Sequence, residues 1–355
     1  MVNNKKLNRK NYFRGKLIVA LYLLVAALFF QNQAIVKAEN QAITDSLYLD
    51  TEIPQSDDKI NQYPISIKIY DFQNLYKKIF SEQDVDTSQS DESSGIYIAK
   101  GSGNGQFIVR PGGMEYYSSE DEYKIKNLIF DELLGYEEIV SENKEDLSEN
   151  ISVQEAEQQL KDYFQIQEDE ELNFIQSGVY QKQELQEWER QLIEIWGDSQ
   201  DVITSWESNE YIALEYEIRK NGISVYGRQE PSQGMAGDFN VQFATYARAL
   251  LGDGQLKTFE IINMYTTDKP EEVQIISAEE ALNILKGNFE DILTDEIYTI
   301  KEIKLEYVAI PDWSSGKAEG VMWKPYWCFI RSDRDGYLWA DRINAITGGN
   351  LSYGE

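Results

Sequence analysis

Two stretches of the chain share one pattern of apolar and polar positions. ISVQEAEQQLKDYF covers Ile151–Phe164 and ISAEEALNILKGNF covers Ile276–Phe289, and seven of the fourteen aligned positions are identical. In each stretch an Ala, a Leu and a Phe follow one another at intervals of four, which places them on one face of a helix. The pattern predicts two amphipathic helices, and its recurrence indicates a duplicated unit.

Both predicted helices carry the sequence of a capping box. Ser152 stands three residues before Glu155, and Ser277 stands three residues before Glu280. In a capping box the Ser hydroxyl accepts a hydrogen bond from the backbone N–H three residues on, and the Glu side chain reaches back. We therefore expect Ser152 and Ser277 to be the N-caps.

Apolar stretches that predict strands follow each helix. Leu214-Glu215-Tyr216 in the first copy recurs as Leu305-Glu306-Tyr307 in the second, and Asn221-Gly222 marks a hairpin turn. A further helix, Gln181–Trp196, lies inside the first copy. The strands are predicted at residues 211–219, 223–226, 241–251 and 256–265, then at 303–310, 323–331 and 337–345. This order predicts an α+β fold with two tandem modules, each a helix packed on an antiparallel β-sheet.

A smaller, β-rich N-terminal module is expected ahead of the two repeats. It has a strand at Tyr63–Phe72, a hairpin around Gly101–Gly105 and a helix at Glu120–Leu134. The Gly-rich loop lacks the Gly-Lys-Ser/Thr ending of a phosphate-binding loop and a strand follows it, so we interpret it as a hairpin turn. The predicted boundaries are a signal peptide at 1–38, a linker at 39–61, the N-terminal module at 62–149, and the repeats at 150–270 and 271–355.

The N-terminus has the pattern of an export signal. A basic segment precedes the apolar run Leu17–Phe30, and Val36-Lys37-Ala38 supplies small residues before a cleavage site. Fourteen helical residues span about 21 Å, less than the roughly 30 Å hydrocarbon core of a bilayer. We expect cleavage after Ala38 and a secreted, extracellular or cell-envelope protein of Gram-positive type, with a retained anchor as the alternative.

Charge restricts the partners that the protein can bind. The net charge is −29, and because residues 1–38 hold seven basic and no acidic side chains, the rest of the chain carries 26 basic and 62 acidic ones. Such a surface repels nucleic acid and anionic lipid. A protein partner in the cell envelope is expected, with no nucleic acid and no integral membrane span in the mature form.

Residue types restrict the chemistry. The chain has no His and one Cys, Cys328, which removes the commonest general base, the usual zinc ligands and any intramolecular disulfide. The segment Ser332–Gly336 resembles the start of a calcium loop but lacks its ligand frame and closing Glu, so a turn is favoured. No catalytic residue, cofactor or metal is expected, and we predict that the protein is not an enzyme.

Aromatic side chains are the candidates for an interaction surface. Most of the seven Trp residues are expected in the core, but Trp313, in the loop Pro311–Gly316, and Trp323 are the least strand-like. We expect these two to be exposed. Together with Tyr326 and Trp327 they form the predicted interaction residues.

The C-terminal motifs resemble those of a known group. Pro325-Tyr326-Trp327 enters one strand, and Ile343–Gly348 (INAITG) ends the last. This part resembles the PepSY and YycI-like superfamily of bacterial cell-envelope proteins, over roughly 150–353 and best over 276–353. The resemblance implies a helix on a curved antiparallel sheet and non-enzymatic roles such as protease inhibition or restraint of a membrane sensor kinase. YycI-like regulators keep an N-terminal anchor, whereas the apolar run here is short.

Three hypotheses for function follow. The first is a non-enzymatic envelope protein with tandem PepSY/YycI-like modules that contacts a membrane signalling protein or a protease. The second is a cell-wall glycan-binding module that stacks sugars on Trp313 and Trp323. The third is an acidic hydrolase with two carboxylates in an aromatic cleft.

Overall fold

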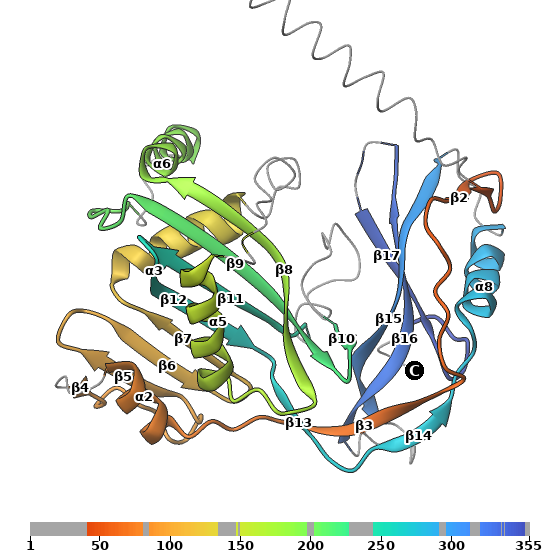
Figure 1. Ribbon diagram of the computed structural model, residues 1–355, viewed down its shortest axis with the longest axis horizontal. Coiled ribbons are helices and arrows are strands. Elements are labelled where there is room, and N and C mark those ends of the chain that lie inside the picture. Colours follow the sequence, from red (N-terminus) through yellow and green to blue (C-terminus); the bar gives the residue numbers. More distant parts are fainter. Residues whose placement is uncertain are drawn as a thin grey trace, which may run out of the picture.

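The computed structural model describes residues 41–80, 85–133, 147, 150–196, 202–226, 244–290, 296–312, 320–334, 336 and 338–351 of the chain. Its strands form two sheets that stand side by side and join along one side, with helices packed on their faces (Figure 1). The fold is α+β, as the sequence predicts.

The first sheet is antiparallel throughout. Its strands run in the order β8 (Glu170–Gln181), β9 (Glu210–Lys220), β11 (Tyr246–Gly252), β12 (Gln255–Ile262), β7 (Gly113–Tyr117), β6 (Gln106–Arg110), β5 (Tyr97–Gly101) and β4 (Val85–Asp86). Because β7 pairs with β12, the strands expected of a separate N-terminal module continue the sheet of the first repeat. The hairpin predicted around residues 101–105 is confirmed as β5 and β6.

Helices cover both faces of this sheet. On one face α2 (Phe72–Phe80) and α5 (Ile151–Tyr163) bury their apolar stripes against the largest core. On the other face lie α3 (Glu120–Asn127), its π-helical continuation η1 (Leu128–Leu133) and α6 (Lys182–Trp196), around a second core. The helices predicted at 120–134 and 181–196 are confirmed.

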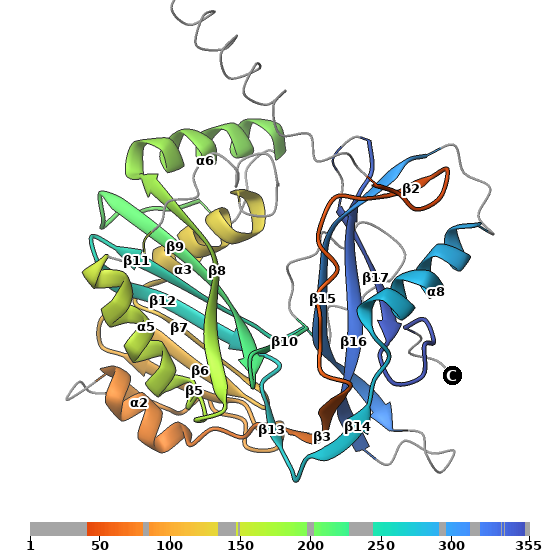
Figure 2. The same ribbon diagram turned by 45° about the vertical axis from the view of Figure 1, so that its right-hand side comes forward.

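The second sheet is built on β15 (Tyr298–Asp312), β16 (Gly320–Ser332) and β17 (Leu338–Asn344), with α8 (Ala278–Glu290) on one face (Figure 2). Strand β2 (Leu47–Leu49) runs parallel to the start of β15 and carries β1 (Gln41–Ala42). The linker predicted at 39–61 is therefore wrong where it covers these strands. Leu47 and Leu49 alternate inward into the core beneath α8, a pattern too short to stand out in a polar segment.

Two strands join the sheets. Strand β10 (Ile223–Val225) forms the predicted hairpin with β9 and pairs in parallel with β15. Strand β3 (Lys59–Ile67) pairs with β16, and also with β13 (Tyr265–Thr267) and β14 (Glu271–Gln274). The largest core accordingly contains Ile65, Tyr216 and Tyr307, from β3, β9 and β15. The predicted boundaries at 149 and 270 do not separate hydrophobic cores.

The two recurring helices bury the stripes that the sequence predicts. In α5 these are Ala156 and Leu160, with Phe164 just beyond its end, and in α8 they are Ala281, Leu285 and Phe289. The capping box of α8 is confirmed, because Ser277 N–H donates to Glu280 Oε2 at 2.8 Å and Glu280 N–H donates to Ser277 Oγ at 3.2 Å.

The cap predicted for α5 is wrong by two residues. Asn150 is the N-cap, and its Oδ1 accepts from the N–H groups of Ser152 at 3.0 Å and Val153 at 3.3 Å. Asn caps as well as Ser does. The position equivalent to Asn150 in the second copy is Ile275, which is buried and apolar and offers no acceptor. The N-cap of α5 is therefore Asn150, whereas α8, which has no acceptor at the equivalent position, is capped by Ser277.

Two predicted features lie outside the described residues: the signal sequence with Ala38, and the apolar run Leu17–Phe30 within it. Within the ranges that the structure describes, no helix is long and apolar enough to cross a membrane.

Candidate functional site

A cleft of about 890 Å³ lies between the two sheets. One wall is formed by β8 at Asn173–Ile175 and by the end of β9. The other wall is formed by residues 54–57, which follow β2, and by β15 at Glu302–Leu305. The volume falls within the range of about 300–1,000 Å³ that is typical of ligand sites.

The bottom of the cleft is aromatic and hydrogen-bonded. The rings of Tyr63 and Tyr307 meet edge to face, with centroids 5.5 Å apart. Asn221 Nδ2 donates to Tyr63 Oη at 2.7 Å, and the hydroxyl of Tyr307 donates to the Asn61 carbonyl at 2.9 Å. Burial, with the neighbouring Tyr63, raises the pKa of Tyr307 above its ordinary value. Hydrogen bonds hold both phenols in place.

The wall on the first sheet combines one apolar side chain with polar ones. Phe174 leaves 40% of its surface exposed at the rim while its ring packs edge to face on Tyr216. Behind it Glu217 accepts from Arg219 Nε at 2.7 Å and from Asn173 Nδ2 at 2.9 Å. Such a surface can take an apolar group at the rim and polar groups beside it.

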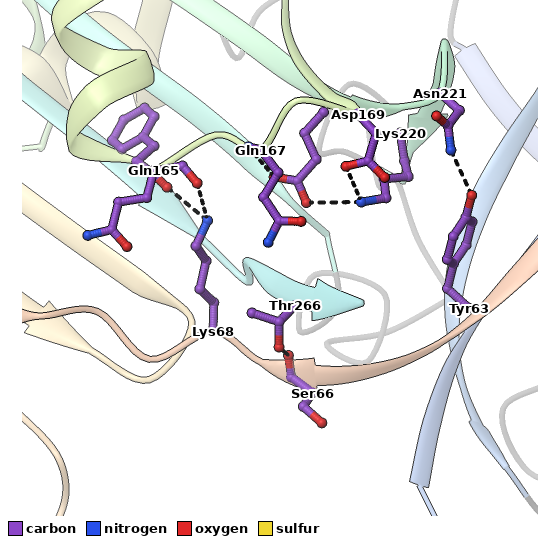
Figure 3. A network of polar contacts seen from close by, with 11 residues as sticks. Tyr63, Ser66, Lys68, Gln165, Gln167, Asp169, Lys220, Asn221 and Thr266 are labelled. Atoms are coloured by element: carbon purple, nitrogen blue, oxygen red, sulfur yellow. Dashed lines mark hydrogen bonds and ion pairs between the residues drawn. The ribbon is translucent and has the colours of Figure 1, made fainter. Parts of the chain in front are cut away.

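A polar network fixes the chain beneath the cleft (Figure 3). Lys220 Nζ lies 2.7 Å from Asp169 Oδ1 and 3.7 Å from Glu170 Oε1. Lys68 follows directly after the end of β3, and its Nζ donates to the backbone carbonyls of Phe164 and Gln165, at 3.0 and 2.7 Å. These carbonyls at the C-terminal end of α5 thereby gain a hydrogen-bond donor. Burial lowers the pKa of Lys68. These bonds tie β3, α5 and β9 together where the sheets join, so the cleft has a rigid base.

A second group of charges is buried on the α3 face of the first sheet. Lys126 Nζ lies 2.8 Å from a carboxylate oxygen of both Glu115 and Glu260, and Arg248 Nε donates to Glu215 Oε1 at 3.0 Å. Burial opposes ionisation of Glu260, but Lys126 and Arg248 outweigh it and leave its pKa lowered. Each carboxylate has a cation beside it, which is typical of a structural ion-pair network.

Glu122, at the start of α3, lacks such a cation. It is fully buried, Tyr211 Oη lies 3.3 Å from its Oε1, and no hydrogen-bond partner of its Oε2 is found among the described residues. Burial raises the pKa of Glu122 to about 7, although Lys257 opposes the shift. The group sits between helix and sheet, away from the cleft lining.

The predicted interaction residues do not form an exposed surface. The expectation that Trp323 is exposed is wrong, because it has none of its surface accessible. Strand β16 begins three residues earlier than predicted, so Trp323 lies between Ala309 of β15 and Tyr63 of β3. Its ring stacks on Tyr307, with centroids 6.2 Å apart. A sugar platform at Trp323 is excluded.

Tyr326 and Trp327 are also buried, at 4% and 1% exposure. Trp327 packs under α8 and donates from Nε1 to the Ile276 carbonyl at 2.9 Å, and part of it reaches the cleft lining. Trp313 lies outside the described residues. Cys328 is buried in β16. No group of Cys, Asp and Glu side chains suited to a metal ion occurs within the described ranges.

Sequence reasoning missed β8, which forms part of one wall of the cleft. A β-bulge between Phe174 and Gln176 breaks its alternation. Leu172 and Tyr180 are an even number of residues apart, yet they enter the cores on opposite faces of the sheet. Only the composition of this segment could have indicated a strand, since it contains no Pro and no basic residue.

The sequence matches no protein-family model and no curated protein. Among solved structures, the chain is similar to an uncharacterized protein from Eubacterium rectale ATCC 33656, whose crystal structure was determined at 1.45 Å resolution. The TM-score is 0.57 at 13% sequence identity, and the match covers 88% of this chain and 92% of the other. The likeness therefore spans both sheets and concerns the fold.

Proposed function

We propose that this is an exported, non-enzymatic binding protein that holds a segment of a partner protein in the cleft between its sheets. The observation that carries the proposal is the cleft itself, with an exposed Phe174 at the rim and hydrogen-bonded Tyr63 and Tyr307 below. The export pattern and the PepSY/YycI-like motifs favour a partner in the cell envelope, such as a membrane signalling protein or a protease.

The tandem organisation belongs to the same proposal. We infer that the α5 and α8 units descend from one duplicated helix-plus-sheet module, since they share the helix pattern and the Leu-Glu-Tyr strand. In each copy the Glu of that strand is buried and pairs with an Arg: Glu215 with Arg248, and Glu306 with Arg342. On this view the cleft lies where the two modules meet.

The test is selection of binding peptides from a random 12-residue library displayed on phage, followed by fluorescence anisotropy with the purified protein. Phe174→Asp should weaken binding about tenfold or more, because it places a charge where an apolar contact is made. Val202→Asp is the matched control, because Val202 is equally exposed, at 40%, and lies outside the cleft lining. Equal loss in both variants, or hydrolysis of peptide, ester or glycoside substrates at enzyme-like rates, would contradict the proposal.

A further inference from the structure

Strand β8 has an unpaired edge. Over Glu170–Gln181 it pairs with β9, and no other described strand pairs with it. Unpaired backbone N–H and C=O groups along a strand are a template for another strand. In both ribbon views β8 is the last strand of the first sheet beside the gap between the sheets (Figures 1 and 2).

This edge lacks most of the features that keep natural sheet edges from pairing. Its sequence, EELNFIQSGVYQ, contains no Pro, Lys or Arg. The edge strands β4, β14 and β17 are shorter, with two, four and seven residues, and a bridge between Ile343 and Asn350 lies at the end of β17. The bulge at Phe174 bends β8 locally but leaves Gln176–Gln181 in regular register with β9. A long edge of this kind points to a docking strand.

The position of the edge connects it with the cleft. Asn173 and Phe174 stand opposite Glu217 and Tyr216 of β9, so their side chains lie on opposite faces of the sheet, and both line the cleft together with Ile175 of the bulge. Two faces of one strand can line the same space where that space lies along the edge of the strand. We propose that the partner segment binds as an added β-strand on the free edge of β8, with an apolar side chain against Phe174. This inference rests on the proposed function and specifies its mode.

The charge of β8 indicates which kind of segment can bind to its edge. On β8 Glu171 is exposed, whereas Glu170 is buried beside Lys220; the strand has no basic side chain, and the whole chain has a net charge of −29. Two copies joined through β8 would bring like charges together, which opposes pairing. The geometry and charge together fit an extended segment of a different protein that carries Lys or Arg rather than Asp or Glu.

The experiment is a backbone-methylation scan of the tightest peptide from the display selection. In an added strand, alternate N–H groups face β8, so methylation at every second position should weaken binding about tenfold, as expected for a lost backbone hydrogen bond and the steric clash. Methylation at the intervening positions should change the affinity less than about twofold. Amide hydrogen exchange in Glu170–Gln181 should slow on binding.

Two charge-reversal variants test whether the segment bound to β8 is basic. Glu171→Lys should weaken binding of a Lys-bearing peptide, whereas Glu279→Lys, on the exposed start of α8, changes the net charge equally and should not. Urea unfolding of both variants confirms that they are folded.

The outcomes separate the two proposals. A peptide that depends on Phe174 but shows no period of two in the methylation scan would overturn strand addition and leave the cleft as a binding site. A selection that yields no peptide dependent on Phe174 would overturn both. Concentration-dependent dimerisation with slowed exchange in β8 of the free protein would show that a second copy is the occupant, and would also overturn the inference.

Discussion

At the scale of single residues, burial without a matching partner is the most informative feature of Glu122. Its neighbours on the same face, Glu115 and Glu260, have Lys126 at hydrogen-bond distance, whereas Glu122 has the hydroxyl of Tyr211. An ionised carboxyl in that position pays a desolvation cost that a neutral one avoids. This difference has a measurable dependence on pH.

We expect Glu122→Gln to stabilise the protein at pH 8 and to have little effect at pH 4. The folded-state pKa is about 7, above the ordinary value of 4.5, so the folded state binds more protons between these values. Stability from this group is therefore present at low pH, decreases as pH rises from about 4.5 to about 7, and is absent above. The neutral amide removes the penalty, on the order of 1–3 kcal/mol at pH 8.

Urea unfolding at pH 4, 6 and 8 measures this difference. Glu120→Gln, at an exposed position two residues earlier in the same first turn of the helix, is the control and should show no such trend. A constant difference between Glu122→Gln and the natural protein across the three pH values would contradict the assignment.

The aromatic interaction candidates show that residue type alone does not predict which side chains are exposed. Trp323 is expected from the sequence to be exposed because it and Trp313 are the least strand-like of the Trp residues. In the structure Pro325 enters β16 opposite Tyr307, and the strand continues on both sides of it. Burial of Trp323 follows from β3, a partner far away in the sequence.

At the scale of elements, the two recurring helices are the parts best predicted from sequence. Their stripes depend on neighbours three and four residues apart, and these are local. Strand β8 is the opposite case. Its bulge shifts the alternation by one residue, so that a period of two could not be recognised without knowing that β9 lies opposite.

We expect the caps of α5 and α8 to differ in their response to mutation. Asn150→Ala should lower the free energy of unfolding by about 1 kcal/mol, because it removes the acceptor for two N–H groups. Ser277→Ala should cost about the same in α8. Ser152→Ala is the matched control and should change stability by less than about 0.5 kcal/mol.

The measurement is urea unfolding of the three variants at one pH. A cost for Ser152→Ala equal to that for Asn150→Ala would show that the box predicted from the sequence, and not Asn150, caps α5.

At the scale of the whole molecule, the sheets are joined by short pairings between distant segments. Ser224 and Val225 of β10 lie beside Glu306 and Tyr307 of β15, and Tyr63 of β3 lies beside Trp323. These pairings place the aromatic base of the cleft. They also explain why one hydrophobic core crosses the boundaries predicted from the repeat.

Export is the prediction that concerns the whole chain. The protein recovered from the medium of its native host should begin at Glu39, because residues 1–38 have the basic, apolar and small-residue segments of a cleaved signal. Ala38→Phe should block cleavage and leave the intact chain in the membrane fraction, whereas Lys37→Gln should be processed normally.

Intact mass and N-terminal sequencing of medium and membrane fractions give the answer. Intact natural chain in the membrane would mean that Leu17–Phe30 is kept as an anchor, and the partner would then be sought among membrane signalling proteins.

The sequence by itself determined the α+β class, the two amphipathic helices and the hairpins at 101–105 and 221–222, because capping, helical spacing and turn residues act over a few positions. The tertiary structure alone decided what those elements surround. Joining β10 to β15 and β3 to β16 requires residues far apart in the sequence, such as Ser224 with Glu306 and Tyr63 with Trp323, to meet in register, and no local pattern encodes that choice. The cleft, the burial of Trp323 and the free edge of β8 all follow from those pairings.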